Sequence, residues 1–362
     1  MPLRADAPLP RVWTLLGYKA GDNTQVRSLA AALAWPWEPR QLHYRSTELL
    51  SNLFLGPTLA GVRRRESDAL EPPWPDLVIT SGRRNEPVAR WIRAASGQRT
   101  KLVQVGRPWA QPSAFDLVLT TRQYRVPAAA NVVELQLPLH GITAAQLGQA
   151  AQQWAPRFAA LPKPRIVVLA GGNSGSFLLT ADRVRQLRAV AEKLAKTTGG
   201  SLCISDSART PAAAGEALFT DTEVPHHFFR WGSDGGDNPY LGYLALGDCF
   251  VVTGDSLSMV AEACATGKPV YLMHPRQHPL PLDSEFAPGP DWLRPGWYGW
   301  RPVSHRLAQR LGPRRMRRDV PALLQSLVDS GRAAWLGGAE PAAPKAGNPD
   351  LDRAVARIKA LF

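Results

Sequence analysis

The residues best suited to chemistry begin a helix that we expect after the apolar run 250–253. That run is typical of a strand buried on both faces of a parallel sheet. Asp255 or Ser256 can cap the following helix, and Gly267 ends it about three turns later. The N–H groups of the first helical turn would point to the carboxyl end of the sheet, where a phosphate group is favoured.

A carboxylate on the same helix would complete a nucleotide site. Asp255 and Glu262 share one face of an α-helix, so Glu262 lies about two turns from the expected phosphate position. At that distance a carboxylate could bind the hydroxyls of a ribose. The alternative is an ordinary capped helix with Glu262 exposed to solvent, and the spacing supports both interpretations equally.

Two series of short apolar strands, each alternating with helical segments, would position these residues. The first series covers residues 11–17, 77–80, 101–105 and 116–120, and the second covers 165–170, 201–205, 227–230, 250–253 and 269–272. This alternation predicts an α/β fold with two doubly wound, Rossmann-like domains.

A proline-rich break at residues 161–164 follows an expected helix over 143–160 and marks the domain boundary. We therefore expect an N-terminal domain over 1–162, a second domain over 163–336, and a linker with a final helix over 337–362. Four apolar residues of that helix recur at helical spacing and need an apolar groove, which we expect on the first domain: Leu351, Val355, Ile358 and Leu361.

The first domain carries its own candidates. Asp22 and Gln25 fit a capping box after the first strand, at the edge where open α/β sheets bind ligands. Arg83 and Arg84 follow a later strand, and two arginines at this edge could bind a phosphate. The alternatives are that Asp22 only caps a helix and that the arginines lie in a solvated turn.

The composition, with 44% hydrophobic and 20% charged residues, is that of a globular protein. The sequence has neither an apolar run long enough to span a membrane nor a secretory signal, so we expect a cytoplasmic protein. The net charge of +13 favours an anionic partner, and charge alone does not select between nucleotide, lipid head group and nucleic acid. A general bias toward arginine explains part of the same excess.

A segment rich in aromatic and basic residues suggests a second partner. Three tryptophans and a tyrosine lie in the proline-rich stretch 274–302, and seven arginines lie in 301–318. Such a composition is typical of contact with an anionic membrane surface, here peripheral to the inner face. We favour the alternative of a long inter-domain loop, because no clean amphipathic helix spans the region. The tryptophans and the tyrosine are Trp292, Trp297, Tyr298 and Trp300.

The sequence lacks the motifs that several other classes of protein require. The loop 170–175 has the degenerate spacing A-x-G-x-x-G, but Asp206 follows too late for a dinucleotide fingerprint, and no tyrosine has a lysine four residues on. The pair His226 and His227 has no partner at metal-ligand spacing, so we expect no metal. The three cysteines are expected in the core. Neither a P-loop nor a G-x-S-x-G elbow is present.

The two-domain pattern, the Gly-rich loop and the unit 246–272 resemble GT-B glycosyltransferases of the kind that adds N-acetylglucosamine to lipid-linked murein precursors. The resemblance implies two domains facing across a cleft, with the helix start at the diphosphate and Glu262 at the ribose. The residues that we assign to nucleotide-sugar binding are Gly171, Gly172, Asn173, Ser174, Arg209, Thr210, Asp255, Ser256, Leu257, Ser258 and Glu262. On the acceptor side we assign Asn23, Thr24, Arg83 and Arg84.

Five motifs together resemble, more specifically, the mitochondrial-fission family named for elongated mitochondria in plants, which has many bacterial members. They cover residues 21–25, 81–84, 171–175, 207–211 and 253–259, in this order along nearly the whole chain. The resemblance implies recruitment of a dynamin-type GTPase in plants, and bacterial members are often labelled sugar-nucleotide epimerases. We do not carry the fission role over to this chain.

The sequence therefore favours a GT-B-like protein that binds a nucleoside-diphosphate sugar and transfers the sugar to an unidentified acceptor. Asp22 is the candidate general base. We expect no cofactor beyond the nucleotide sugar as substrate, and no nucleic-acid partner. The alternatives are a non-catalytic adaptor and a nucleoside-diphosphate-sugar epimerase of GT-B fold.

Overall fold

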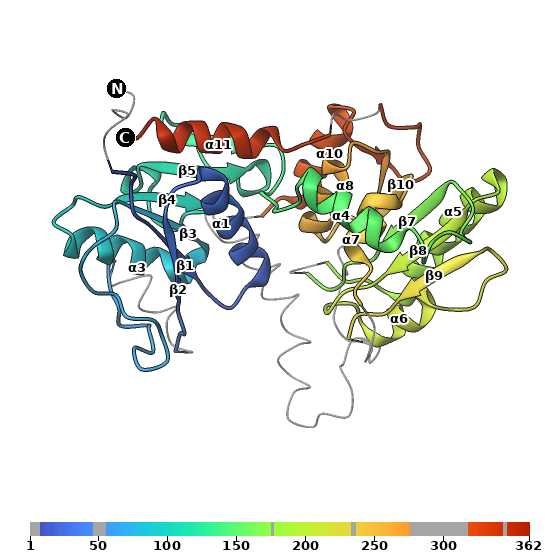
Figure 1. Cartoon of the computed structure of the whole chain (residues 1–362), viewed down its shortest axis with the longest axis horizontal. Helices are drawn as coiled ribbons and strands as arrows, with labels where there is room; N and C mark the ends of the chain where they lie inside the picture. The colour runs from blue at the N-terminus through green and yellow to red at the C-terminus, as the bar shows by residue number, and fades with distance from the viewer. Residues whose placement is uncertain (1–7, 46–55, 175–176, 233–236, 276–317, 343–345) are drawn as a thin grey trace. The chain divides into compact units, whose positions relative to one another are not determined.

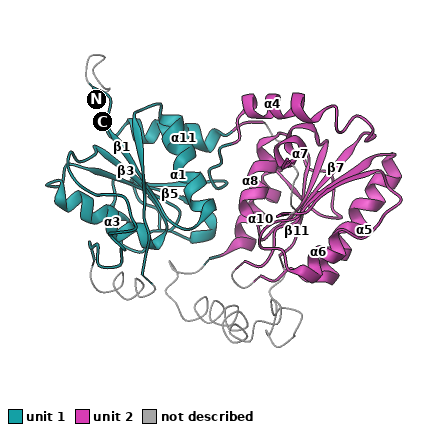
Figure 2. Cartoon of the chain, turned by 60° about the horizontal axis from the view of Figure 1, so that its bottom comes forward, with its two compact units in different colours: residues 1–141, 313–318, 348–362 teal, residues 142–312, 319–347 magenta. Residues whose placement is uncertain are grey.

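The computed structural model describes residues 8–45, 56–174, 177–232, 237–275, 318–342 and 346–362, which fall into two compact units (Figure 2). The first unit contains the described residues of Met1–Gly141 with Arg318 and Asn348–Phe362. The second contains those of Ile142–Gly312 and Asp319–Gly347. Most of the segment rich in tryptophan and arginine, residues 276–317, lies outside the described residues, and so does Gly175.

The first unit is built on a six-stranded parallel sheet in the order β2-β1-β3-β4-β5-β6 (Figure 1). Its strands are β1 (Val12–Leu16), β2 (Trp37–Gln41), β3 (Leu77–Ser81), β4 (Lys101–Val105), β5 (Leu117–Thr121) and β6 (Val132–Leu135). Its helices are α1 (Ala20–Leu33), α3 (Gly82–Ala95) and α11 (Pro349–Lys359), with 3-10 turns at Pro112–Ala114 and Arg122–Tyr124.

Helices cover both faces of this sheet, which explains why its central strands are continuous apolar runs. On one face the buried residues of α1 and α11, such as Leu29 and Ile358, pack with Ile79 of β3. On the other face α3 contributes Val88 and Ile92 to a second apolar cluster. Burial of both faces fixes the alternating strand and helix pattern.

In the first unit two strands, β2 and β6, were not predicted, and the predicted cap of α1 is wrong. The strand β2 was not predicted, because Trp37–Gln41 is a half-buried edge strand with a proline and lacks an apolar run. Asp22 is not the N-cap of α1, since the helix starts earlier, after Lys19, and places Asp22 in its first turn. The side chain of Gln25 donates to the carbonyl of Gly21 instead of closing a capping box.

The second unit holds another six-stranded parallel sheet, in the order β12-β11-β10-β7-β8-β9. Its strands are β7 (Arg165–Leu169), β8 (Ser201–Ser205), β9 (His226–Phe229), β10 (Cys249–Thr253), β11 (Val270–Met273) and β12 (Ala334–Trp335). Its helices are α4 (Ala144–Trp154), α5 (Ala181–Thr198), α6 (Ala212–Leu218), α7 (Tyr240–Leu246), α8 (Leu257–Ala265) and α10 (Val320–Asp329).

Within this unit α5 and α6 cover one face of the sheet, and α7, α8 and α10 lie on the other (Figure 2). The face under α5 and α6 is closed by buried residues such as Val184 and Leu218, packed on Ile166 and Ile204. The two sheets are parallel and layered by helices, so the predicted α/β class with two doubly wound, Rossmann-like units is confirmed.

The predicted boundary at residue 162 is wrong, because the division falls between Gly141 and Ile142. The helix α4 belongs to the second unit and packs against α7. Trp154 at its end lies 5.5 Å from Phe158, which in turn stacks on Tyr243 of α7. The proline-rich break ends the helix locally, whereas this aromatic packing decides to which unit the helix belongs.

The last helix, α11, packs in the first unit against α1 and β5. The carboxylate of Asp350 accepts N–H bonds from Gln136 and Leu137 at 2.7 and 3.1 Å. The connection before α11 extends the second unit to Gly347, beyond the expected end at 336. None of the helices in the described part of the chain is long and apolar enough to cross a membrane.

Candidate functional site

Both sheets have a point at which the strand order reverses, and open α/β sheets bind ligands outside the carboxyl ends of the strands at such a point. In the second unit this point lies between β10 and β7, which is the first strand of that sheet along the chain. In the first unit it lies between β1 and β3. The loops after these four strands, together with the helices α1, α3 and α8, contain most of the residues that the sequence predicted.

In the second unit the loop after β7 is held tightly against the loops after β8 and β10. The Gly171 N–H donates to the Thr253 hydroxyl at 2.7 Å, and the Gly171 carbonyl accepts from the hydroxyls of Ser207 and Thr210. A Cβ added at Gly172 would lie 2.0 Å from the carbonyl oxygen of Arg209. The glycines of this loop are therefore required by close packing between loops.

Asp255 is a buried carboxylate at the centre of these contacts. It accepts the N–H of Gly172 at 2.8 Å, so its side chain points to the loop after β7 instead of capping α8. Burial raises the pKa of the Asp255 carboxyl, and the hydrogen bonds from Gly172 and Thr253 oppose that rise. The cap position of α8 is Ser256, whose side chain makes no capping hydrogen bond.

The guanidinium of Arg209 lies in the same place. Its Nη2 is 3.6 Å from Oδ2 of Asp255, and its Nη1 donates to the carbonyl of Asn173 at 3.2 Å. Asp206, at the end of the neighbouring strand, accepts the N–H of Trp231 at 2.5 Å. Arg209 is half-exposed, so it places a positive charge beside the start of α8.

Two other predicted residues, Asn173 and Ser174, form hydrogen bonds with backbone groups of the residues that follow them. The side chain of Asn173 accepts the N–H of Leu179 at 3.1 Å and so holds the loop that follows. The Ser174 N–H bonds to the carbonyl of Phe177. At the start of α8, Leu257 is buried and Ser258 is exposed.

Glu262 lies further along α8 and is not a solvated side chain. The hydroxyl of Tyr240 donates a hydrogen bond to its carboxylate. Burial raises the pKa of the Glu262 carboxyl, and the hydrogen bond from Tyr240 opposes that rise. A carboxylate has about four acceptor positions, so Glu262 keeps capacity for a further donor.

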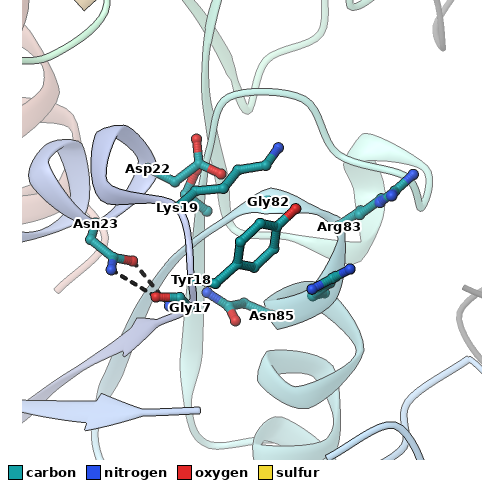
Figure 3. Close-up of a pocket in the computed structure, with 10 residues that line it drawn as sticks. Gly17, Tyr18, Lys19, Asp22, Asn23, Gly82, Arg83 and Asn85 are labelled. Atoms are coloured by element: carbon teal, nitrogen blue, oxygen red, sulfur yellow. Dashed lines mark hydrogen bonds between the residues drawn. The ribbon is translucent and has the colours of Figure 1, made fainter. Parts of the chain in front are cut away.

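The first unit has a pocket at its own point of strand reversal (Figure 3). Its empty volume is about 320 Å³ including the open mouth, and loops after β1 and β3 line it. Of the acceptor-side residues that the sequence predicted, Asn23, Arg83 and Arg84 line this pocket and Thr24 does not. The lining residues are Gly17, Tyr18, Lys19, Asp22, Asn23, Ser81, Gly82, Arg83, Arg84 and Asn85.

Asp22, the candidate base, is partly buried in this pocket. Burial raises the pKa of its carboxyl, while the charges of Lys19 and Arg318 oppose that rise. Gly82 has φ +79°, and a Cβ there would lie 3.0 Å from Oδ2 of Asp22. The turn into α3 therefore needs glycine on both counts.

The polar side-chain atoms of Asn23 and Thr24 form hydrogen bonds with nearby backbone groups, so their role is structural. Asn23 accepts the Gly17 N–H at 3.0 Å and donates to the Gly17 carbonyl at 2.8 Å, as the dashed lines of Figure 3 show. Thr24 donates to the Ala20 carbonyl one turn earlier. We therefore describe both as positioning residues for the turn after β1.

Four polar or charged residues at these two sites were missed by sequence reasoning. Lys19 stands beside the predicted loop, and Tyr240 is a tyrosine in an ordinary helix. Arg107 follows β4, a position that the strand pattern could have indicated. Arg318 carries no local signal, since it joins the first unit through a contact with Gln123 that spans 195 residues.

Among the described residues, no group of three or more His, Cys, Asp or Glu side chains could hold a metal ion. The cysteines are free, and burial raises the pKa of each thiol to about 12. Their thiolates are therefore scarce at neutral pH, which leaves Cys203, Cys249 and Cys264 as packing residues.

Two Rossmann-like units with polar loops at each point of strand reversal define a GT-B-like protein. The same fold occurs in UDP-GlcNAc 2-epimerase from Methanocaldococcus jannaschii, with a TM-score of 0.50 and 11% identity, over 97% of this chain and 100% of that one. The family model described as "Mitochondrial fission ELM1" matches residues 20–281. The chain belongs to this family.

Two curated relatives agree with that assignment. The chain is 34% identical to "Mitochondrial fission protein ELM1" of Arabidopsis thaliana over 237 residues, which are 59% of this chain and 55% of the relative. The alignment thus spans about half of the plant protein. An uncharacterised protein of Rickettsia prowazekii is 24% identical over 297 residues, covering 73% of this chain and 83% of that protein.

Proposed function

We propose that this GT-B-like protein binds a nucleoside-diphosphate sugar at the second unit and transfers the sugar to an acceptor bound at the first. The observation that carries the proposal is the position of Arg209, whose guanidinium reaches the residue preceding the N-cap of α8. A cation and the N–H groups of a helix start together favour a diphosphate.

Glu262 supports the nucleotide part of the proposal. It lies on the same helix as the expected phosphate position and is anchored by the hydroxyl of Tyr240. An anchored carboxylate loses little conformational entropy when it accepts a ribose hydroxyl. Glu262 would then orient the nucleotide, while Arg209 and the first turn of α8 bind the diphosphate.

Asp22 supports the transfer part. A general base works best when its pKa approaches the working pH. Burial raises the pKa of the Asp22 carboxyl, which brings it closer to that pH. In the proposed step the acceptor oxygen forms a bond to the anomeric carbon as the bond from that carbon to the diphosphate oxygen breaks. Asp22 takes the acceptor proton, and the nucleoside diphosphate leaves with the electron pair.

One observation favours a non-catalytic adaptor as the second candidate. Arg209 pairs with Asp255, which also accepts the Gly172 N–H, so these groups bind one another within the protein. A protein that has kept the two-unit fold only to bind a partner could retain such contacts. An epimerase of the same fold differs from a transferase in needing no acceptor.

Calorimetric titration of the full chain against UDP, GDP, CDP and ADP tests the proposal. We expect one of them to bind, and Arg209→Ala to weaken that binding about tenfold or more, because a hydrogen bond to a charged group contributes about 1.5 to 3 kcal/mol. The salt dependence of the affinity should also become shallower. Arg185→Ala is the matched control, since Arg185 is an exposed arginine of α5 that pairs with Asp182.

If the parent protein binds none of the four nucleotides, the transferase proposal is wrong and the adaptor is favoured. If Arg209→Ala and Arg185→Ala have equal affinities and salt slopes, the phosphate assignment is wrong. Incubating the matching nucleotide sugar without acceptor separates the enzyme classes. An epimerase changes the sugar under these conditions, whereas a transferase leaves it intact.

A further inference from the structure

The pocket of the first unit gathers positive charge from several separate loops. Lys19 follows β1, and Arg83 and Arg84 follow β3, the two strands between which the strand order reverses. Arg107, which follows β4, and Arg318, from a distant part of the chain, do not line the pocket but lie near it. Figure 3 shows Lys19 and Arg83 extending to the same side of the pocket as Tyr18.

The arginines are close enough to influence one another. Burial lowers the pKa of the Arg107 guanidinium, and the positive charges of Arg318 and Arg83 lower it further. Like charges held at this spacing destabilise the unliganded protein. A bound anion would relieve that repulsion.

Each cation is held in place by an aromatic ring or an amide. The guanidinium carbon of Arg84 lies 4.3 Å from the centre of the Tyr18 ring, and that of Arg83 lies 5.5 Å from Trp109. Nε of Arg318 donates to the side chain of Gln123 at 2.6 Å. Because these contacts orient the side chains before binding, less ordering entropy is lost when an anion arrives.

The negative charge nearby is much smaller. Asp22 is the one carboxylate among the residues that line the pocket, against the cations Lys19, Arg83 and Arg84. Glu86, on the next turn of α3, is buried and accepts the N–H groups of Trp109 and Ala110 at 2.6 and 2.7 Å. The described residues that line the pocket therefore carry a net positive charge.

The number and type of donors favour a phosphate over a carboxylate. One arginine fork satisfies both oxygens of a carboxylate, whereas a phosphate group with three terminal oxygens accepts from several cations at once. The backbone adds further donors, since α3 begins at Gly82 inside the pocket and Ser81 makes no side-chain cap.

We propose that this pocket binds the phosphate group of a phosphorylated ligand, and that the ligand is the acceptor of the sugar. The anion site stands on the geometry of the first unit alone, and only its role as acceptor site rests on the proposed function. Asp22, beside the phosphate, would then face a hydroxyl of the same ligand. The acceptor is thus a phosphorylated alcohol, either soluble or carried as a lipid head group.

Titration of the full chain with inorganic phosphate tests the site. Lys19→Gln combined with Arg83→Gln should weaken phosphate binding about tenfold or more. Arg64→Gln removes the charge of an exposed arginine in the same unit and should bind phosphate like the parent. Arg83→Lys keeps the charge and should recover part of the affinity, which separates loss of binding from loss of folding. Thermal unfolding of each variant checks the fold.

Equal phosphate affinity in the double variant and the parent would overturn the proposal, as would an equal loss in Arg64→Gln. The Arg209→Ala variant distinguishes the two sites, because it should lose nucleotide binding and keep the phosphate binding that depends on Arg83. If nucleotides fail to bind but phosphate binds through Arg83, the proposed function fails and the anion site stands. If nucleotides bind and the double variant keeps its phosphate affinity, the reverse holds.

A vesicle arm identifies the source of the phosphate. Vesicles of phosphatidylcholine with phosphatidic acid present a phosphomonoester, and pure phosphatidylcholine vesicles present none. Sedimentation with the first kind, lost in the Lys19 and Arg83 double variant, supports a lipid head group. Binding of inorganic phosphate without vesicle sedimentation supports a soluble acceptor. Sedimentation that is unchanged in the double variant contradicts a role for this pocket at a membrane.

Discussion

The hydroxyl of Tyr240 donates a hydrogen bond to the carboxylate of Glu262, joining α7 to α8 inside the second unit. Burial together with the neighbouring Glu262 charge raises the pKa of the Tyr240 hydroxyl well above its ordinary value, so that it stays a donor at neutral pH. The pair explains how a carboxylate can be kept half-buried and still be oriented for a ligand.

We expect Tyr240→Phe to lower the free energy of unfolding by about 1 to 3 kcal/mol, because the Glu262 carboxylate would lose its donor while remaining buried. Urea denaturation at neutral pH measures the change. Tyr18→Phe is the control, since Tyr18 is 60% exposed and keeps its ring under Arg84. A Tyr240→Phe variant as stable as the control would show that the hydrogen bond contributes nothing.

Asp255 should make stability depend on pH. Burial raises its pKa in the folded protein above the unfolded value of about 3.9. Between the unfolded and the folded pKa of Asp255, the folded state therefore binds more protons than the unfolded chain. The free energy of unfolding falls as the pH rises through this range. Asp255→Asn removes this contribution while its amide oxygen can still accept the Gly172 N–H.

The prediction is that the free energy of unfolding falls less between about pH 4 and pH 7 in Asp255→Asn than in the parent. Denaturant titrations across this range provide the curves. Asp182→Asn changes an exposed carboxylate of α5 and should follow the parent. Parallel curves for the parent and Asp255→Asn would rule out a raised folded pKa for Asp255.

Gly172→Ala should displace the loop that carries Arg209. The new methyl group would lie 2.0 Å from the Arg209 carbonyl oxygen, so the backbone must move, at a cost of about 1 to 3 kcal/mol. We also expect weaker nucleotide binding, measured by calorimetry. Gly148→Ala is the matched control because nothing lies within 4 Å of its added Cβ, and in helix α4 it should stabilise by about 0.5 to 1 kcal/mol. Unchanged stability and nucleotide affinity in Gly172→Ala would contradict the packing argument.

The tail helix α11 should stabilise the first unit. Ile358 is completely buried, and Ile358→Ala is expected to lower the free energy of unfolding by about 2 to 5 kcal/mol through the cavity that it leaves. Lys359→Ala, at an exposed neighbouring position, should change little. Deletion of residues 348–362 should speed hydrogen exchange in α1 and β5, which α11 contacts. Parent-like protection there would mean that the packing contributes no stability.

Most of the strands, and the edge of each sheet at which the polar loops lie, could be predicted from the amino-acid sequence. Parallel strands buried on both faces must be continuous apolar runs, so β3, β4, β7 and β8 are visible without a structure. Strand direction then places the following loops at the carboxyl ends. Edge strands such as β2 lack that signal. An edge strand has a neighbouring strand on one side only and is less buried, so it does not need a continuous run of apolar residues.

The partners of the site residues could not be predicted from the sequence and became known from the three-dimensional structure. Helical spacing relates residues three or four apart, whereas Glu262 pairs with Tyr240 22 residues away and Asp255 accepts the Gly172 N–H from 83 residues away. The domain boundary and the place of Arg318 in the first unit also depend on contacts between residues that are far apart in the sequence. Such contacts form where packing brings separate loops together, and no local pattern in the sequence encodes them.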